Sequence, residues 1–333
     1  MSALLWASLV GKALGSEARV TIEKETFLGW PNTYVLRNGA VEVRVVTDVG
    51  PRIMAVASRG GPNLFYVRES EAGWSGETEW VFRGGWRLWV APERRETTYD
   101  PDNAPCKVEL RDDRTLVVMG PPQPRAGIQK IVEVRLDPEQ PRIRLKSRIR
   151  NLFERPVEYA PWSLAVMRPG GRALIPVDRG PLDAFDAVRR YILWSYARID
   201  DPRYRWGNEL VQVDQRQVRA GAAWPRAQRR QDESKIATDS QQGWAAYAWN
   251  DTVFLKRFAY VPGAKYPDGG ATIEVYSSAE FLELEHLGPL ATIAPGEEVI
   301  MPEDWWVITG LRVPEEEAAA LAALRPWLER SAW

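Results

Sequence analysis

Residues 281–290, FLELEHLGPL, combine a strand-like apolar pattern with two glutamates and the only histidine of the chain. Side chains alternate between the two faces of a strand, so Glu283 and Glu285 project to one side with Phe281, and His286 projects to the other. Two desolvated carboxyls about 6–7 Å apart have pKa values that move in opposite directions, which suits an acid and a base. The stretch predicts general acid–base chemistry, or, if both glutamates face water, a solvated and ion-paired strand face.

An arginine and several tryptophans add candidate binding groups for a polyol. Arg87 lies in GGWRLW, and its planar guanidinium offers paired donors to vicinal hydroxyls or to a carboxylate, although it would also serve to bridge loops. The chain has 16 tryptophans, whose flat rings cover the apolar faces of sugars well. Trp86, Trp89 and Trp162 are the candidates for such a platform, and core packing is the alternative use of each ring.

Other polar stretches are less specific. Lys256 lies in the apolar run TVFLKRF, where a buried lysine beside a carboxylate would mark a pocket and an edge lysine would extend to solvent. The segments DPDN at 100–103 and YPDGG at 266–270 place oxygens densely enough for calcium, but they also read as turns. With one histidine and one cysteine, Cys106, a zinc site is not expected. We predict no metal site and no cofactor.

The elements that must position these residues are short strands separated by Gly, Pro, Asn and Asp. VEVRVV at 41–46 and RIRLKSRIR at 142–150 alternate between apolar and charged residues. Helical periodicity is confined to 314–325, where Pro314 and three glutamates begin the segment. Residues 178–242 are expected to form long loops with one strand near 191–196. The pattern predicts an all-β protein, a large antiparallel β-sandwich with a short C-terminal helix, and residues 19–333 as one domain.

Composition excludes some classes of partner. The formal net charge of -1 over 333 residues gives no global attraction to nucleic acid or to anionic membranes. No stretch reaches the ~20 apolar residues of a membrane helix. Residues 1–18 are predicted to be a signal-like or disordered N-terminus, since an apolar run precedes small residues but lacks a basic flank. We expect a cytoplasmic protein, with a periplasmic or secreted one as the alternative, and the sequence leaves the oligomeric state open.

Five stretches, taken in order, resemble the galactose mutarotase-like superfamily, the large β-supersandwich fold. They are closest to an uncharacterised bacterial domain family within it. The stretches are VGPRIMAV through GGPNLFYV (49–67), GGWRLWVAPE (84–93), YDPDNAP (99–105), NLFERPVEYAPWSLAVMRPGG (151–171) and the segment from KYPDGG to APGEE (265–298). The resemblance implies the supersandwich fold, and it indicates a function less sharply because one fold hosts many sites.

The resemblance also implies a role for Glu283. In mutarotases, a glutamate on a late strand, shortly before a PGE turn, takes the proton from the anomeric hydroxyl. Here LELEH followed by APGEE places Glu283 at the matching position, and Glu285 stands where glutamine is usual. The two histidines of those enzymes, one of which is the acid, have no counterpart at 83–86 or 160–163. The acid would then be Glu285, Lys235, Lys256 or a tyrosine such as Tyr266.

Together these features predict a carbohydrate-active protein that binds a sugar or sugar acid on the concave sheet face. Its chemistry would be that of an aldose 1-epimerase, an isomerase, with Glu283 as base and Glu285 beside it. The alternative is a non-catalytic carbohydrate-binding or structural module of polysaccharide metabolism, which the absent histidines favour. A lyase or hydrolase on the same scaffold is a third reading. The predicted substrate-binding residues are Arg87, Trp86, Trp162, Lys235, Lys256 and Tyr266.

Overall fold

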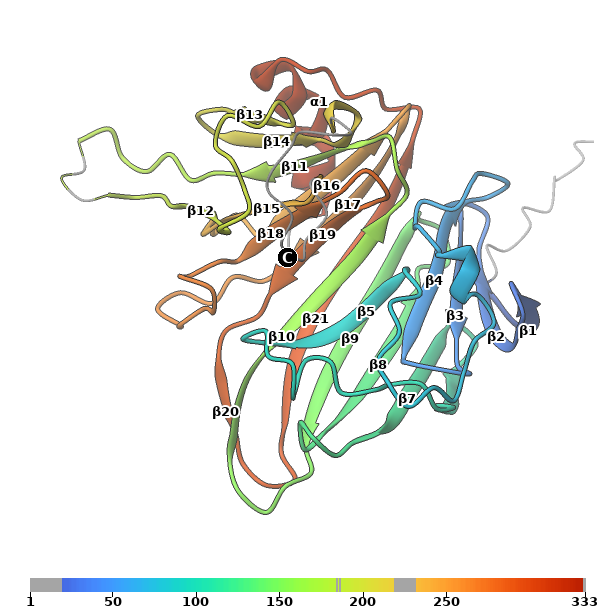
Figure 1. Ribbon diagram of the computed structural model, residues 1–333. Coiled ribbons are helices and arrows are strands. Elements are labelled where there is room, and N and C mark those ends of the chain that lie inside the picture. Colours follow the sequence, from blue (N-terminus) through green and yellow to red (C-terminus); the bar gives the residue numbers. More distant parts are fainter. Residues whose placement is uncertain (1–19, 184, 186, 219–231, 332–333) are drawn as a thin grey trace, which may run out of the picture.

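Two large antiparallel sheets stack on one another across a shared apolar layer (Figure 1). The computed structural model describes residues 20–183, 185, 187–218 and 232–331. The predicted signal-like stretch at 1–18 lies outside these residues. Each strand pairing is antiparallel, and only short 3-10 helices and one α-helix accompany the strands of the described part of the chain. The prediction of an all-β sandwich is confirmed.

The first sheet has eleven strands. In spatial order they are β1 (Thr21–Phe27), β2 (Trp30–Arg37), β3 (Val41–Val46), β4 (Arg52–Ser58), β5 (Trp86–Ala91), β10 (Val157–Met167), β19 (Leu282–Leu287), β18 (Ile273–Ser277), β15 (Ser234–Thr238) and β12 (Tyr191–Leu193), with β20 (Ala291–Ile293) paired to β10. Strands far apart in the sequence are therefore neighbours at the centre of this sheet.

The second sheet has ten strands. In spatial order they are β13 (Tyr204–Trp206), β14 (Leu210–Asp214), β11 (Arg172–Pro176), β16 (Trp244–Trp249), β17 (Thr252–Phe258), β21 (Glu298–Thr309), β9 (Arg142–Asn151), β8 (Ile128–Leu136), β7 (Thr115–Gln123) and β6 (Lys107–Asp112). The helices are η1 (Glu69–Glu71), η2 (Gln215–Gln217) and α1 (Glu317–Arg330). Figure 1 shows α1 at the end of the molecule where β11, β13 and β14 lie.

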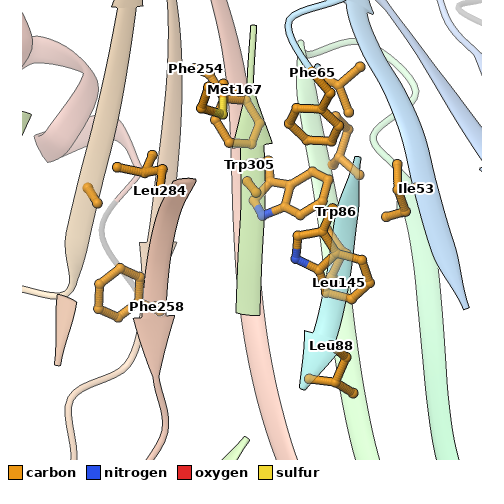
Figure 2. Packing of buried hydrophobic residues seen from close by; sticks show 14 of the residues in the cluster. Ile53, Phe65, Trp86, Leu88, Leu145, Met167, Phe254, Phe258, Leu284 and Trp305 are labelled. Atoms are coloured by element: carbon orange, nitrogen blue, oxygen red, sulfur yellow. The ribbon is translucent and has the colours of Figure 1, made fainter. Parts of the chain in front are cut away.

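Alternation along each strand separates a core face from a polar face. On β3, Val41, Val43 and Val45 are buried between the sheets, while Glu42 and Arg44 pair with one another on the other face. Figure 2 shows side chains of both sheets meeting in the middle layer, among them Trp86 of β5 and Trp305 of β21, whose ring centroids are 5.7 Å apart. Burial of such apolar area, at roughly 25 cal/mol per Å², is the main force that holds the two sheets together.

Two local predictions need correction. The helix begins at Glu317 rather than at 314, because the Glu316 side chain accepts hydrogen bonds from the N–H groups of Ala318 and Ala319 and so caps the first turn. It also continues to Arg330, past the predicted end at 325. The region 178–242 was predicted as loops with one strand, yet it contains β13, β14 and β15 besides β12. These strands are short, so their period-2 pattern is hard to recognise in a charged segment.

Strand parity on β19 is as predicted. Leu282 and Leu284 point into the layer between the sheets, and His286 stacks there on Phe258 with ring centroids 4.2 Å apart. Glu283 and Glu285 point to the opposite, outer face of the eleven-stranded sheet, where they contact groups from β5, β10 and β15. The outer face of these central strands is therefore where the candidate site is built.

Candidate functional site

Lys235 on β15 is the centre of a buried charged group on the outer sheet face. Its Nζ lies 2.6 Å from Oε2 of Glu274 on β18 and 3.1 Å from Oε2 of Glu285 on β19. Glu274 and Glu285 lie directly opposite one another on the neighbouring strands β18 and β19. The partner of Lys235 on β18 is Tyr276, two residues beyond Glu274, so the lysine side chain approaches both carboxyls diagonally. We call Lys235, Glu274 and Glu285 the outer cluster.

Burial sets the protonation of the outer cluster. It raises the pKa of Glu274 well above the usual value, opposed by Lys235 and reinforced by Glu285. It also raises the pKa of Glu285, opposed by Lys235 and reinforced by the charge of Glu283. Burial alone would lower the pKa of Lys235, but the two carboxyls outweigh it and raise that pKa well above the usual value. The cluster therefore holds a charged ammonium between two carboxyls that compete for a further proton.

Two tryptophan rings enclose the ammonium. Nζ of Lys235 lies 4.6 Å from the ring centroid of Trp162 on β10 and 4.7 Å from that of Trp194, which follows β12. Trp162 also donates from Nε1 to Oε2 of Glu285, at 2.9 Å. Cation–π attraction of this kind strengthens where water is excluded. The lysine head group is thus held in one place by two carboxyls and two rings.

A second ion pair lies beside the outer cluster. Nη2 of Arg87 on β5 donates to Oε1 of Glu283 at 2.9 Å, and the guanidinium lies 4.1 Å from the ring centroid of Trp89. Two glycines precede this strand, and at Gly85, with φ of +67°, an added Cβ would lie 2.6 Å from the Ile53 carbonyl oxygen. Only glycine therefore lets β5 start against β4 and aim Arg87 at the outer face. Nε and Nη1 of Arg87 have no hydrogen-bond partner among the described residues.

A cavity of about 900 Å³ opens above these residues. Its aromatic lining is Trp80, Tyr99, Trp162 and Trp194, and its charged lining includes Lys235, Glu93 and Asp268. The ring centroids of Trp80 and Tyr99 are 5.2 Å apart, and both pack on Trp89. Flat rings beside carboxylates and a fixed ammonium are the groups that a polyhydroxylated ring needs, since it has apolar faces and a polar rim.

The two predicted glutamates differ in accessibility. Glu283 keeps 8% of its surface exposed, whereas Glu285 is 0% exposed behind Trp162 and Lys235. A ligand on this face can therefore touch Glu283 directly, while Glu285 acts only through Lys235 and Trp162. Neither glutamate is among the residues that line the cavity, so Glu283 borders the site rather than forming its wall.

The structure brings some predicted site residues together and separates others. Glu283, Glu285, Arg87, Trp162 and Lys235 gather on the outer face of five adjacent strands. The outer cluster and the Arg87–Glu283 pair share strand β19. Within this group, the hydrogen-bonded residues Arg87 and Glu283 are 196 positions apart in the chain.

Three predicted binding residues lie elsewhere. Trp86 is fully buried between the sheets (Figure 2), and its Nε1 donates to Oγ of Ser163. Lys256 points from β17 into the same layer, because its position on the second sheet faces the first sheet. Tyr266 stacks on Tyr260 and lines a separate cavity. These three residues therefore lie apart from the cavity that Lys235 lines.

Sequence reasoning missed several residues of the site. Glu274 was recognisable, because it alternates with Ile273 and Val275 in TIEVYS and so faces away from the core. Trp80, Tyr99 and Trp194 lie outside the regular strands, where no periodicity indicates the direction of a side chain. Among the described residues, no group of three or more His, Cys, Asp or Glu side chains is arranged to hold a metal ion. Nor is any helix of residues 20–331 that the structure describes long and apolar enough to cross a membrane.

Comparison with solved structures supports the fold. A galactose mutarotase-like protein from Lactobacillus casei is 9% identical, with a TM-score of 0.54 over 83% of this chain and 100% of that chain. The Slr1438 protein from Synechocystis is 13% identical, with a TM-score of 0.53 over 86% and 99% of the two chains. A galactose mutarotase-like protein from Clostridium acetobutylicum is 10% identical, with a TM-score of 0.50 over 87% and 99%. At these identities the likeness shows the fold alone.

Sequence comparison identifies the family. A search of curated protein sequences returned no match. The family model of a domain of unknown function, DUF4380, matches residues 89–309, which span β10, β15, β18 and β19 and hence most of the outer face described above. The chain therefore belongs to the DUF4380 family, and its fold is that of the galactose mutarotase-like proteins.

Proposed function

We propose that this protein binds a saccharide in the cavity above the outer cluster. The observation that carries the proposal is the position of Lys235, which lines the cavity with its ammonium held by Glu274 and Glu285 and enclosed by Trp162 and Trp194. A fixed donor needs no reorganisation when it meets a hydroxyl, a ring oxygen or a carboxylate of a sugar. The galactose mutarotase-like structural neighbours agree with a carbohydrate ligand.

The cavity walls suit such a ligand in chemistry and size. Trp80, Tyr99 and Trp162 supply apolar surface, and Glu93 and Asp268 supply hydroxyl acceptors at the rim. A volume of about 900 Å³ accommodates one or a few sugar units. Burial raises the pKa of Asp268, with Lys235 opposing the shift, so this rim carboxyl can also donate at acidic pH.

Acid–base chemistry on the bound sugar is the catalytic form of this proposal. The Glu283 carboxylate would take the proton from the anomeric hydroxyl, the bond between the anomeric carbon and the ring oxygen would break, and the Lys235 ammonium would give the ring oxygen a proton that it regains on reclosure. Lys235 would stabilise the negative charge that develops on that oxygen, and Glu285 would position the lysine. Reclosure on the other face of the carbonyl gives the second anomer, with every proton returned.

A non-catalytic sugar-binding module is the second candidate. Glu283 is held by Arg87 rather than free in the cavity. The only histidine of the chain, His286, is buried between the sheets on the opposite face of β19. Both observations favour binding without turnover, in which Arg87 and Glu283 serve as fixed polar contacts.

Binding is tested by calorimetric titration of the full chain with D-glucose, D-galactose, D-glucuronate and D-galacturonate. We expect saturable binding of at least one sugar and a roughly fivefold lower affinity in Trp194→Leu, since an aromatic contact contributes about 1 kcal/mol. Trp74→Leu is the matched control, because Trp74 is half exposed and does not line the cavity. Equal affinities of the two variants, or no binding of any sugar, would contradict the proposal.

Catalysis is tested by following the optical rotation of freshly dissolved α-anomers of the same sugars. For an epimerase we expect a rate above that of buffer, reduced about 100-fold or more in Glu283→Gln because the base is lost. A wild-type rate equal to that of buffer, with sugar binding intact, assigns the protein to the non-catalytic module.

A further inference from the structure

A second cavity, of about 610 Å³, lies near the start of α1, where β11 begins and β16 ends in the ten-stranded sheet. Four segments line it: the turn before β11, the η2 helix, the β16–β17 turn and the segment that leads into α1. It shares no lining residue with the cavity above Lys235. The proposed saccharide function therefore makes no use of it.

Three arginines meet at this cavity. Arg172, Arg216 and Arg312 line it together with a single carboxylate, that of Glu315. Counting formal charges, the lining carries three positive groups and one negative group, an excess of two positive charges. Asp214, which lies under the cavity without lining it, is already engaged by Arg216 through Nε and Nη2, both at 2.7 Å.

Arg172 is a buried residue of this site whose side chain is held in place by the fold. Its side chain is only 5% exposed, and Nη2 donates to the carbonyl oxygens of Val313 at 2.9 Å and Pro314 at 2.7 Å, which fixes the guanidinium. Nε has no hydrogen-bond partner among the described residues, and Nη1 approaches Glu315 Oε1 only to 4.0 Å. A buried guanidinium whose donors are incompletely used is costly, so its surroundings favour an added anion.

Repulsion among the arginines also favours an added anion in this cavity. Burial, and then the charge of Arg216, lower the pKa of Arg172 despite Glu315 and Asp214 nearby. Glu315 is half exposed and is shared by Arg205 at 2.7 Å and Arg216 at 3.1 Å. Counting the neighbouring Arg205 and Asp214 as well, four arginines face two carboxylates, which leaves two positive charges uncompensated.

We propose that this cavity binds a dianionic tetrahedral oxyanion, inorganic sulfate or a phosphate group, held by Arg172, Arg216 and Arg312. Two negative charges neutralise the excess on the lining, whereas one carboxylate would leave a positive charge. Guanidinium groups present parallel N–H donors that match the oxygen spacing of phosphate and sulfate. Glu315 competes with the ligand for the same donors.

The test is calorimetric titration of the full chain with inorganic phosphate at pH 8 in chloride buffer of low ionic strength. We expect saturable binding of one phosphate per chain. Arg312→Gln should weaken it about tenfold, because a charge-assisted contact is lost from an exposed residue that the fold does not need. Glu315→Gln should strengthen it, since a competing negative charge is removed. Arg111→Gln, an exposed arginine on β6 at the opposite edge of the same sheet, is the matched control.

Parallel titrations with sodium sulfate and sodium acetate identify the group. Binding of both tetrahedral anions supports a site for any dianionic tetrahedral oxyanion. Binding of only one of them supports the proposal and identifies that anion as the ligand group. Acetate binding as strong as phosphate binding would overturn the proposal, as would the absence of saturable heat with both tetrahedral anions. Equal losses in Arg312→Gln and Arg111→Gln would also overturn it, since they indicate diffuse surface charge. Sugar titrations of the same variants should be unchanged, which separates this site from the saccharide cavity.

Discussion

Two buried lysine–carboxylate groups lie on opposite sides of the same sheet. The outer cluster, Lys235 with Glu274 and Glu285, faces the aromatic cavity. On the inner side, Lys256 lies 3.5 Å from Glu303 in the layer between the sheets. Both groups have contacts to β19, the outer one through Glu285 and the inner one through the Leu284 carbonyl.

The inner group is shielded from solvent, and its positive and negative charges are balanced. Nζ of Lys256 donates to Oγ of Ser163 at 3.0 Å, and that hydroxyl donates to Glu303 at 2.9 Å. Trp305 donates to Glu303 at 2.8 Å, and His286 lies 3.6 Å from the same carboxylate. We call Lys256, Glu303 and His286 the inner cluster. One lysine meets one carboxylate there, and all of its members are at most 1% exposed.

The outer cluster differs in stoichiometry and in access. Two carboxyls share one lysine, and Lys235 itself lines the cavity. The comparison teaches that a buried ion pair does not by itself mark a ligand site, even where burial lowers the pKa of its lysine, as it does for Lys256. What distinguishes the outer cluster is that its central donor is fixed and also reachable from a cavity.

The largest expected effect comes from breaking the inner cluster. Lys256→Met leaves Glu303 buried without its cation, so we expect the free energy of unfolding in urea to fall by about 3 kcal/mol or more. Lys256→Met combined with Glu303→Gln removes both charges and should recover most of that loss. Sugar affinity of the folded single variant should equal that of wild type. A loss below 1 kcal/mol would show that the inner pair is not structurally important.

The matching change in the outer cluster should have a smaller and pH-dependent effect on stability. In Lys235→Met, Glu274 and Glu285 can take up protons, because burial already raises the pKa of both above 4.5. The folded state then binds more protons than the unfolded state as pH falls, so the variant gains stability toward acid. We expect a loss of about 2 kcal/mol at pH 8 that diminishes toward pH 6.

Two further measurements accompany that variant. Sugar affinity should fall about tenfold or more in Lys235→Met, because the fixed donor of the cavity is removed. Lys146→Met, an exposed lysine on β9, is the matched control and should change neither stability nor affinity. Unchanged sugar affinity in Lys235→Met would remove the distinction between the two clusters.

The smallest expected effect concerns His286. Burial, together with the charge of Lys256, lowers the pKa of His286 well below 6.5, so the folded protein keeps this imidazole neutral. Below about pH 6.5 the unfolded chain binds a proton that the folded chain does not, and stability falls by up to about 1.4 kcal/mol per pH unit. Urea unfolding of wild type and His286→Gln at pH 7.5, 6.5 and 5.5 measures the difference in slope. Parallel curves would mean that the histidine is not held neutral.

Local patterning predicted much of the fold. Alternation placed Val41, Val43 and Val45 on one face of a strand, and it placed Glu283 and Glu285 opposite His286. These features depend on the period of an extended chain, which is a property of neighbouring residues. Strands β13, β14 and β15 and the exact start of α1 were missed, because a cap and a strand of three to five residues carry too little periodic signal.

The composition of the site depended on long-range pairing. Lys235 meets Glu274 and Glu285 only because β15, β18 and β19 are adjacent in the sheet, and Arg87 reaches Glu283 from a strand 196 residues away. Trp86 and Trp89 are close in sequence, yet one fills the core and the other supports Arg87. Strand order within the sheet is not encoded in the spacing of any one segment.

The sequence by itself determined the all-β class, the faces of individual strands and the position of Glu283 that the mutarotase resemblance singles out. Only the tertiary structure decided that Lys235 is the fixed donor of the cavity, that Glu285 is sealed behind it, and that Lys256 belongs to the core. The physical reason is that alternation is a local property of the backbone, whereas burial and ion pairing depend on which strands lie side by side and which face is covered by the second sheet.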